Sequence, residues 1–267
     1  MPRTRTYGLD IDTIRYAQRV KSGSGATILP EPLKQINKFV IGVKKLGLWN
    51  SMVCWPMRSI HNAGTGSTLY SLGGQGVFNG NVENSAQWGY LGFKFPITSS
   101  RILVSNFITP SNTTFQAVAF RLTAESAFGG IFGVPNVYQG TQPTINNYGS
   151  SANLIFQIRD YVTGQTKVSR VYQLSSRYNY CAWMSINSSL NSMSTSFNKE
   201  LYTTDIGTSF TFTNPYTMSF GNVNSVNAPW KDIISHTAQF SINIDENTKN
   251  AIYDLYKRTL GIGLNLP

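Results

Sequence analysis

Few of the residues on which enzymes and metal sites depend occur in this 267-residue chain. It has two cysteines and two histidines, and charged residues make up only 13% of it. Cys54 and Cys181 stand far apart with no cluster of histidines near either, which argues against a disulfide framework and a cysteine-based metal motif. We therefore expect two buried thiols, no metal site and no cofactor.

Long apolar runs are missing as well. The N-terminus, MPRTRTYG, lacks the apolar stretch of a signal peptide, and no run of about 18 apolar residues that could cross a bilayer occurs anywhere. We expect no membrane partner. The 41% of hydrophobic residues and 13% of aromatic ones are nevertheless enough to build a core for one large domain.

Acidic residues are scarce relative to basic ones, and the chain has a formal net charge of +10. Residues 1–60 carry ten basic and three acidic side chains, so +7 of that charge lies there. Clustered basic side chains gain affinity for nucleic acid or an acidic partner by counterion release. The alternative is a solvated, weakly basic helix surface, which is favoured because nucleic-acid arms carry denser runs of charge. The candidate contacts are Arg3, Arg5, Arg15, Arg19, Lys34, Lys38 and Lys45.

Hydrophobic periodicity predicts two helices in this segment. The first covers DIDTIRYAQRV, with Ile11, Ile14 and Val20 at helical spacing, an aspartate as its cap and SGSGAT as its end. The second covers LPEPLKQINKFVIGVKKLGLW, with a proline in its first turn and a glycine at its C-terminal cap. Its apolar stripe consists of Leu33, Ile36, Phe39, Val40 and Val43, with Lys34, Lys38 and Lys45 on the other side.

From about residue 68 the hydrophobic period changes to two, which is typical of strands. The clearest hairpin is residues 154–174, where Thr163 and Gly164 supply the turn. Many short strands separated by turns favour a two-sheet sandwich or jelly roll. A last helix follows in DENTKNAIYDLYKRTLG, and we expect it to pack Ile252, Leu255 and Tyr256 against the sandwich.

Three stretches carry a family resemblance: LYSLGGQGVFNGNVENSAQWGYLGFKF, YCAWMSINSSLNSMSTSFNKEL and YTMSFGNVNSVNAPWKDIISHTAQFSINIDENTKNAIYDLY. In order, they resemble the strands, loops and closing helix of the concanavalin A-like, or laminin-G-like, jelly roll. The resemblance implies a mainly β jelly-roll sandwich over residues 61–267. A short basic helical segment over residues 1–60 would precede it, and a C-terminal helix would close it.

The two ends carry a narrower resemblance. The stretch RYAQRVKSGSGATILPEPLKQINKFVIGVKKLGLWNSM is similar to a segment that precedes such jelly rolls in structural proteins of tailed bacteriophages and related viruses, and IYDLYKRTLGIGL resembles their C-terminus. This implies a virion structural protein of the capsid, decoration, vertex or tail, which assembles with copies of itself and other virion proteins. Residues 1–60 would be an attachment element whose removal leaves a soluble β domain.

Motifs for catalysis are not present. Glycanases on this fold carry E-x-D-x-x-E, because two inward-facing acids must flank the scissile bond, and no such triplet occurs. The close acid pairs, Asp10 with Asp12 and Asp245 with Glu246, both suit the start of a helix. The two histidines stand alone without a nucleophile motif, and FGGIFGV is not followed by the Gly-Lys-Ser/Thr of a phosphate loop. We therefore expect no enzymatic activity.

Aromatic and amide side chains suggest a second function, that of a glycan-binding receptor-recognition module of a phage fibre or tail. Sugar sites combine aromatic faces with hydrogen-bonding side chains. The candidates, in two loop-like segments, are Tyr138, Asn146, Asn147, Tyr148, Asn227 and Trp230. Tyrosine and tryptophan are equally common in protein interfaces, so contacts between subunits are the favoured alternative.

Overall fold

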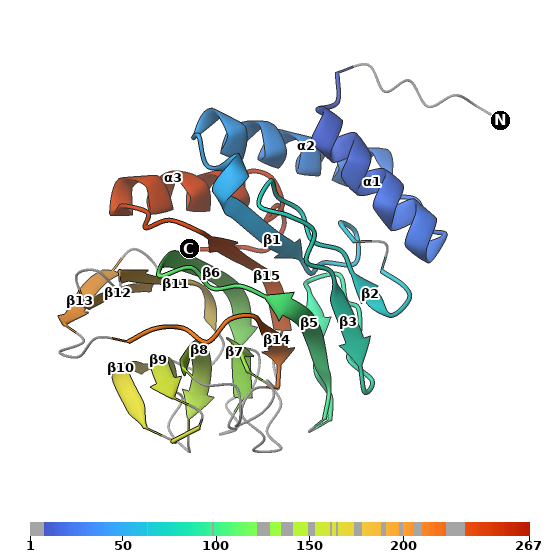
Figure 1. The fold of residues 1–267 in the computed structure, drawn as a ribbon. Coiled ribbons are helices and arrows are strands. Elements are labelled where there is room, and N and C mark those ends of the chain that lie inside the picture. The colour runs from blue at the N-terminus through green and yellow to red at the C-terminus, as the bar shows by residue number, and fades with distance from the viewer. Residues whose placement is uncertain are drawn as a thin grey trace.

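The computed structural model describes residues 8–62, 64–97, 99–121, 129–134, 141–148, 153–160, 162–163, 165–173, 178–187, 191–197, 200–205, 210–222 and 233–267. Within them, two antiparallel sheets face each other and α-helices cover the far side of one sheet (Figure 1). We call the three layers the helix layer, the middle sheet and the outer sheet. The prediction of a mainly β sandwich with helices near both ends is confirmed.

The helix layer consists of α1 (Ile11–Ser24), α2 (Pro30–Lys45) and α3 (Glu246–Lys257). The middle sheet has the order β1 (Met52–Pro56), β15 (Ile233–Phe240), β6 (Asn112–Arg121), β11 (Tyr178–Asn187), β12 (Ser192–Phe197) and β13 (Glu200–Asp205), with β4 (Phe93–Lys94) also paired to β15. The outer sheet has the order β10 (Thr166–Gln173), β9 (Asn153–Asp160), β8 (Thr141–Tyr148), β7 (Gly129–Gly133), β14 (Tyr216–Gly221), β5 (Arg101–Phe107), β3 (Gly80–Glu83) and β2 (Thr68–Leu69). The predicted hairpin of residues 154–174 is confirmed as β9 and β10.

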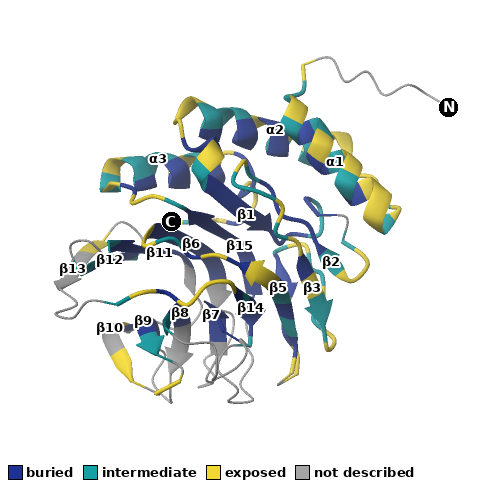
Figure 2. Cartoon of the chain, viewed as in Figure 1, coloured by how far each residue is buried: buried dark blue, intermediate teal, exposed yellow. Residues whose placement is uncertain are grey.

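Two apolar cores separate the three layers. Trp55, Phe115 and Phe156 lie in the core between the sheets, whereas Phe39 and Trp183 lie in the core between the helix layer and the middle sheet. Every residue of β1 and β15 is buried, because the middle sheet is covered on both faces (Figure 2).

The α2 helix follows its predicted apolar stripe. Ile36, Phe39, Val40 and Val43 are buried and Leu33 is partly buried, because this face lies on the middle sheet. The stripe therefore packs on the protein's own sandwich.

The α1 helix departs from the prediction in part of its buried face. Val20 is buried as predicted, but Ile11 is 53% exposed, and Thr13 and Tyr16 are buried. The helix ends at Ser24, inside the predicted break, with Gly25 as its left-handed C-cap. Gly23 in the last turn lies close to Tyr70, so a Cβ at this position would collide with the Tyr70 hydroxyl.

The α3 helix closes the layer largely as predicted. Asp245 caps it by accepting a hydrogen bond from the Thr248 backbone N–H at 2.9 Å. Ile252 and Tyr256 are buried against the middle sheet, whereas the partly buried Leu255 reaches α2 at Gly42.

The β1 strand lies inside the segment 1–60 that the sequence set apart. It pairs antiparallel with β15, from Met52 opposite Phe240 to Pro56 opposite His236. The N-terminal segment thus contributes an edge strand to the sandwich as well as two of its covering helices.

Candidate functional site

An open groove of about 460 Å³ runs between α1 and the stretch 72–77. Its volume falls in the range of about 300–1,000 Å³ that is common for small-molecule sites. One wall is a single face of α1, since its residues repeat at helical spacing. The residues around the groove are Asp12, Arg15, Gln18, Arg19 and Ser22 of α1, together with Trp49, Leu72, Gly73, Gly76 and Val77. We refer to it as the α1 groove.

At one end of the α1 groove, a lysine of α2 forms ion pairs with two aspartates. Lys44 Nζ lies 2.6 Å from Asp12 Oδ2 and 2.7 Å from Asp10 Oδ1. Burial opposes the charge on Lys44, but its hydrogen bonds to the two carboxylates outweigh burial and raise its pKa. Both acids are therefore paired with a cation of the protein itself, although one negative charge remains uncompensated by Lys44, and Asp10 is also the N-cap of α1 as predicted.

Two arginines follow on the same helix face and play different roles. The Arg19 Nη2 atom donates a hydrogen bond of 2.8 Å to the carbonyl of Ser71, which ties α1 to the opposite wall. Arg15 is more exposed and makes one loose contact of 3.4 Å from Nη1 to Asp12 Oδ1. Arg15 is thus the cation of the α1 groove that is most accessible to a ligand.

The rest of the α1 groove combines apolar surface with neutral hydrogen-bonding groups. Trp49 and Leu72 are largely buried and form its floor, and Val77 is 61% exposed at its rim. Gln18 and Ser22 add an amide and a hydroxyl. Small-molecule sites typically have this composition of apolar walls with a few polar groups.

The floor of the α1 groove depends on one glycine. Gly73 has a φ of +147° and lies against the backbone of Met52, so a Cβ there would collide with the Met52 carbonyl oxygen. We expect Gly73→Ala to lower the free energy of unfolding by about 2–4 kcal/mol, from backbone strain and overpacking together. Urea unfolding followed by tryptophan fluorescence measures this change. Ser22→Ala on the opposite wall is the control, with an expected change within about 0.5 kcal/mol.

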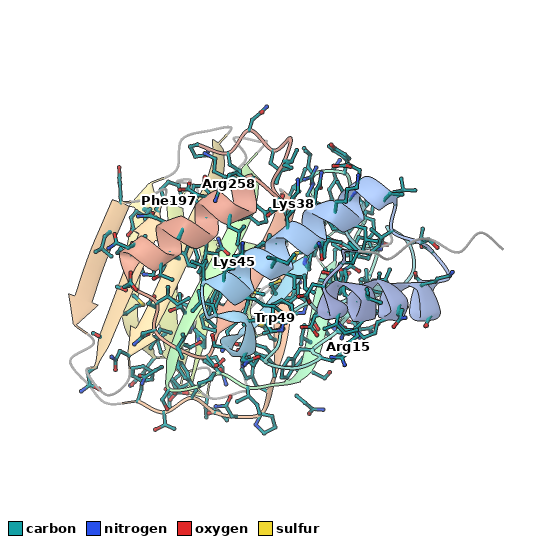
Figure 3. All side chains as sticks on the ribbon, turned by 90° about the horizontal axis from the view of Figure 1, so that it is seen from above. Arg15, Lys38, Lys45, Trp49, Phe197 and Arg258 are labelled. Carbon is teal, nitrogen blue, oxygen red and sulfur yellow. The ribbon has the colours of Figure 1, made fainter. Side chains whose placement is uncertain are left out.

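The basic residues predicted to contact a partner do not form one surface. Arg15 and Arg19 line the α1 groove, whereas Lys34, Lys38 and Lys45 are exposed on α2. Viewed from above the helix layer, Arg15 and Trp49 lie on the same flank, and Lys38 and Lys45 lie along α2 (Figure 3). Arg3 and Arg5 lie outside the described residues.

The predicted glycan or interface residues belong to the outer sheet where they are described. Asn146, Asn147 and Tyr148 are the last three residues of strand β8. The sequence predicted a loop at these positions, and the structure has a strand there. Gly130 of β7 pairs with Asn146 on one side and with Gly221 of β14 on the other. The C-terminal ends of β8 and β14 therefore lie at the same end of the sheet. Tyr138, Asn227 and Trp230 lie outside the described residues, and a site at this end stays a prediction.

Sequence reasoning missed most of the α1 groove. The polar residues Asp12, Arg15, Arg19 and Ser22 repeat at three- and four-residue spacing, and that stripe was a usable signal. Leu72 and Val77 carry no such signal in the sequence. These residues come close to α1 only because the chain folds back after β1, which local patterns do not predict.

The thiols and imidazoles are buried. Cys54 and Cys181 are buried thiols, as predicted, and burial raises the pKa of Cys181 to about 12. Burial likewise lowers the pKa of both His61 and His236 to about 3. Among the described residues, no three His, Cys, Asp or Glu side chains are grouped closely enough to hold a metal ion. Helices in the same part of the chain are too short or too polar to span a membrane.

Comparison with solved structures finds the same fold in receptor-binding domains of botulinum neurotoxins. The serotype D binding domain is 14% identical with a TM-score of 0.58, over 78% of this chain and 52% of that domain. The serotype D ligand binding domain in complex with N-acetylneuraminic acid is 16% identical with a TM-score of 0.59, over the same shares. The binding domain of the mosaic serotype C/D is 14% identical with a TM-score of 0.56, over 78% and 51%.

At these identities the likeness shows the fold alone, a β-sandwich, and this chain spans about half the length of those domains. No family model matches the chain, and no curated protein matches it by sequence. The narrower resemblance to phage jelly rolls gains no support from these neighbours.

Proposed function

We propose that this protein is a binding module that recognises carbohydrate through the α1 groove. The observation that carries the proposal is the groove's chemistry. Trp49, Leu72 and Val77 offer apolar surface for the C–H face of a sugar, and Gln18 and Ser22 offer groups for its hydroxyls. The fold adds support, because β-sandwich neighbours serve as receptor-binding domains and one was solved with N-acetylneuraminic acid.

The charges around the α1 groove favour an acidic sugar. Lys44 already neutralises much of the two aspartates' charge, and Arg15 and Arg19 stand on the same helix face. The carboxylate of an acidic sugar could approach Arg15 and displace its loose contact with Asp12. No enzymatic step is part of the proposal, since Asp10 and Asp245 act as helix caps and both histidines are buried.

A second candidate is a structural role in a multimeric particle such as a virion. The observation that favours it is exposed apolar side chains on the helix layer: Leu29 at the start of α2 is 67% exposed, and Ile11 and Leu46 are exposed at the opposite end of α2. Such side chains are common at contacts between subunits, although single exposed ones are also normal. Light scattering on a size-exclusion column tests this role. Particles or oligomers that dissociate with Leu29→Ser would support it, and a strict monomer at high concentration would contradict it.

A glycan array tests the carbohydrate proposal. We expect binding to acidic glycans that weakens at least about tenfold in Arg15→Ala and in Gln18→Ala, equivalent to about 1.4 kcal/mol for each lost contact. Lys38→Ala is the matched control, since it removes an exposed cation from α2 away from the groove. An array with no bound glycan, or binding that neither groove variant changes, would contradict the proposal.

A further inference from the structure

The chain has two histidines, and the fold brings both to one place beneath the helix layer. His236 lies in β15, and its ring centre is 4.7 Å from that of Tyr256 in α3 and 6.0 Å from that of Phe39 in α2. His61 follows β1, and its Nε2 lies 2.8 Å from Gln35 Oε1 in α2. Both histidines are 0% exposed.

A buried arginine stands beside the pair. Arg58 is 1% exposed, and its guanidinium donates to three backbone carbonyls, those of Tyr90 at 3.0 Å, Leu260 at 2.7 Å and Ile262 at 2.8 Å. It has no ion pair with any carboxylate in the described part of the chain. The carbonyls of Leu260 and Ile262 follow the C-terminus of α3, whose negative dipole end stabilises the positive charge of Arg58. Nothing described nearby would compensate a further positive charge.

The other titratable side chains in this region are phenols and thiols: Tyr16 of α1, Tyr253 and Tyr256 of α3, Cys54 of β1, Cys181 of β11, and Tyr70. Burial raises the pKa of Tyr16, Cys54 and Tyr256, so these three are uncharged at physiological pH. Aspartate and glutamate do not occur among these described neighbours. A protonated imidazole would therefore face Arg58, the second histidine and apolar surface, which is an unfavourable setting for a cation.

We infer that the two histidines form an acid-operated latch, which holds the helix layer on the middle sheet at neutral pH and releases it on acidification. Their contacts with Gln35 and Phe39 join α2 to the sheet. The Tyr16 hydroxyl also donates to the His61 carbonyl at 3.0 Å, which joins α1. All these contacts cross the boundary between the helix layer and the middle sheet. When the helix layer lifts, the histidines become exposed to water and can take up protons.

The direction of the pH effect follows from proton linkage. Burial first, and then Arg58 and the other imidazole, lower the pKa of His61, and burial lowers that of His236, to about 3 each. In the open state each pKa returns to about 6.5, so the open state binds more protons. The stability contributed by the neutral histidines is present above about pH 6.5 and is lost as the pH falls towards 3.

Opening is expected to stop at the helix layer. Both histidines lie on the helix side of the middle sheet, because His236 contacts Phe39 and Tyr256 and His61 bonds to Gln35. Separate cores can open separately. Cys54 and Cys181 also belong to the helix-side core, so they become accessible when the layer lifts.

Thiol labelling of the full chain measures this opening. The rate at pH 7.5 and pH 5.0, relative to free N-acetylcysteine at the same pH, gives the opening equilibrium. We expect a rise of about a thousandfold between the two pH values, roughly thirtyfold for each histidine. His236→Phe and His61→Gln should each reduce the rise to about thirtyfold. Phe39→Leu is the control, because it loosens the same contact without removing a titrating group and should leave the ratio unchanged.

Two results would overturn the latch. One is a ratio of labelling rates at pH 5.0 and pH 7.5 that neither histidine variant lowers. If His236→Phe fails to fold, His61→Gln alone provides this test, because it keeps an amide near Gln35. The other is hydrogen exchange at pH 5.0 in which β9 and β14 of the outer sheet lose protection together with α1 and α2. That result would mean global unfolding. Protected outer strands with exchanging helices would support the latch.

Discussion

A chain that begins at Trp49, without α1 and α2, is expected to aggregate and to have a much lower free energy of unfolding than the full chain. These helices contribute Tyr16, Phe39 and Val43 to the core on the middle sheet, and their removal would expose the apolar residues of that core. Each large side chain returned to water costs about 1.5–3 kcal/mol, and a domain is stable by only about 5–15 kcal/mol. Removing residues 1–60 would also delete β1, which pairs with β15.

This expectation replaces the one drawn from the sequence, that residues 1–60 can be removed without harm to the β domain. The measurement is the soluble yield and the thermal unfolding midpoint of the truncated chain. A chain that begins at Gly8 retains every contact described above and serves as the control. A soluble chain from Trp49 with an unchanged midpoint would show that the helices are an appendage.

The second large effect is expected at Arg58. Replacing it with methionine keeps much of the side-chain volume but removes the donor from the buried carbonyl of Leu260 and from the partly buried carbonyls of Tyr90 and Ile262. Each buried group that loses its partner costs about 1–3 kcal/mol, so we expect Arg58→Met to lower the free energy of unfolding by about 3–5 kcal/mol. Urea unfolding measures the loss.

Arg258→Met is the matched control for this substitution. Arg258 is exposed at the end of α3, and its Nε donates to the Asp254 carbonyl on the surface. The same chemical change there should alter stability by no more than about 0.5 kcal/mol. Equal losses in the two variants would contradict a structural role for the buried guanidinium.

Sequence patterns predicted α2 and α3 well, because the apolar stripes and capping residues of these helices lie close together in the sequence. The same reasoning was only partly right for α1: Val20 is buried as predicted, but Ile11 is exposed. Tyr16 is buried in the first half of the helix, because its hydroxyl bonds to the His61 carbonyl and to the Asn62 amide. That contact depends on tertiary structure, and helical periodicity does not contain it.

Strand β15 shows a second limit of local patterns. Ser235, Thr237 and Gln239 alternate along it and would normally be read as one polar, solvent-exposed face, yet every residue is buried. The cause is that both faces of the strand are covered: Thr237 and Gln239 pair with Trp55 and Val53 of the core between the sheets, and Ala238 and Phe240 lie in the core under the helix layer. Period-two alternation cannot reveal this second cover. The α1 groove was missed for a related reason, because its floor joins Trp49 to Leu72 across a turn of the chain.

The most direct test of carbohydrate recognition is an amide NMR titration with N-acetylneuraminic acid, with N-acetylglucosamine as the neutral probe. The account predicts that the acidic sugar shifts the amides of residues 15–22 and 72–77, and that Arg15→Ala removes these shifts. Shifts at the end of β8, around Asn146 and Tyr148, would place binding on the outer sheet and contradict the α1 groove. No shift with either sugar would contradict the recognition of such sugars altogether.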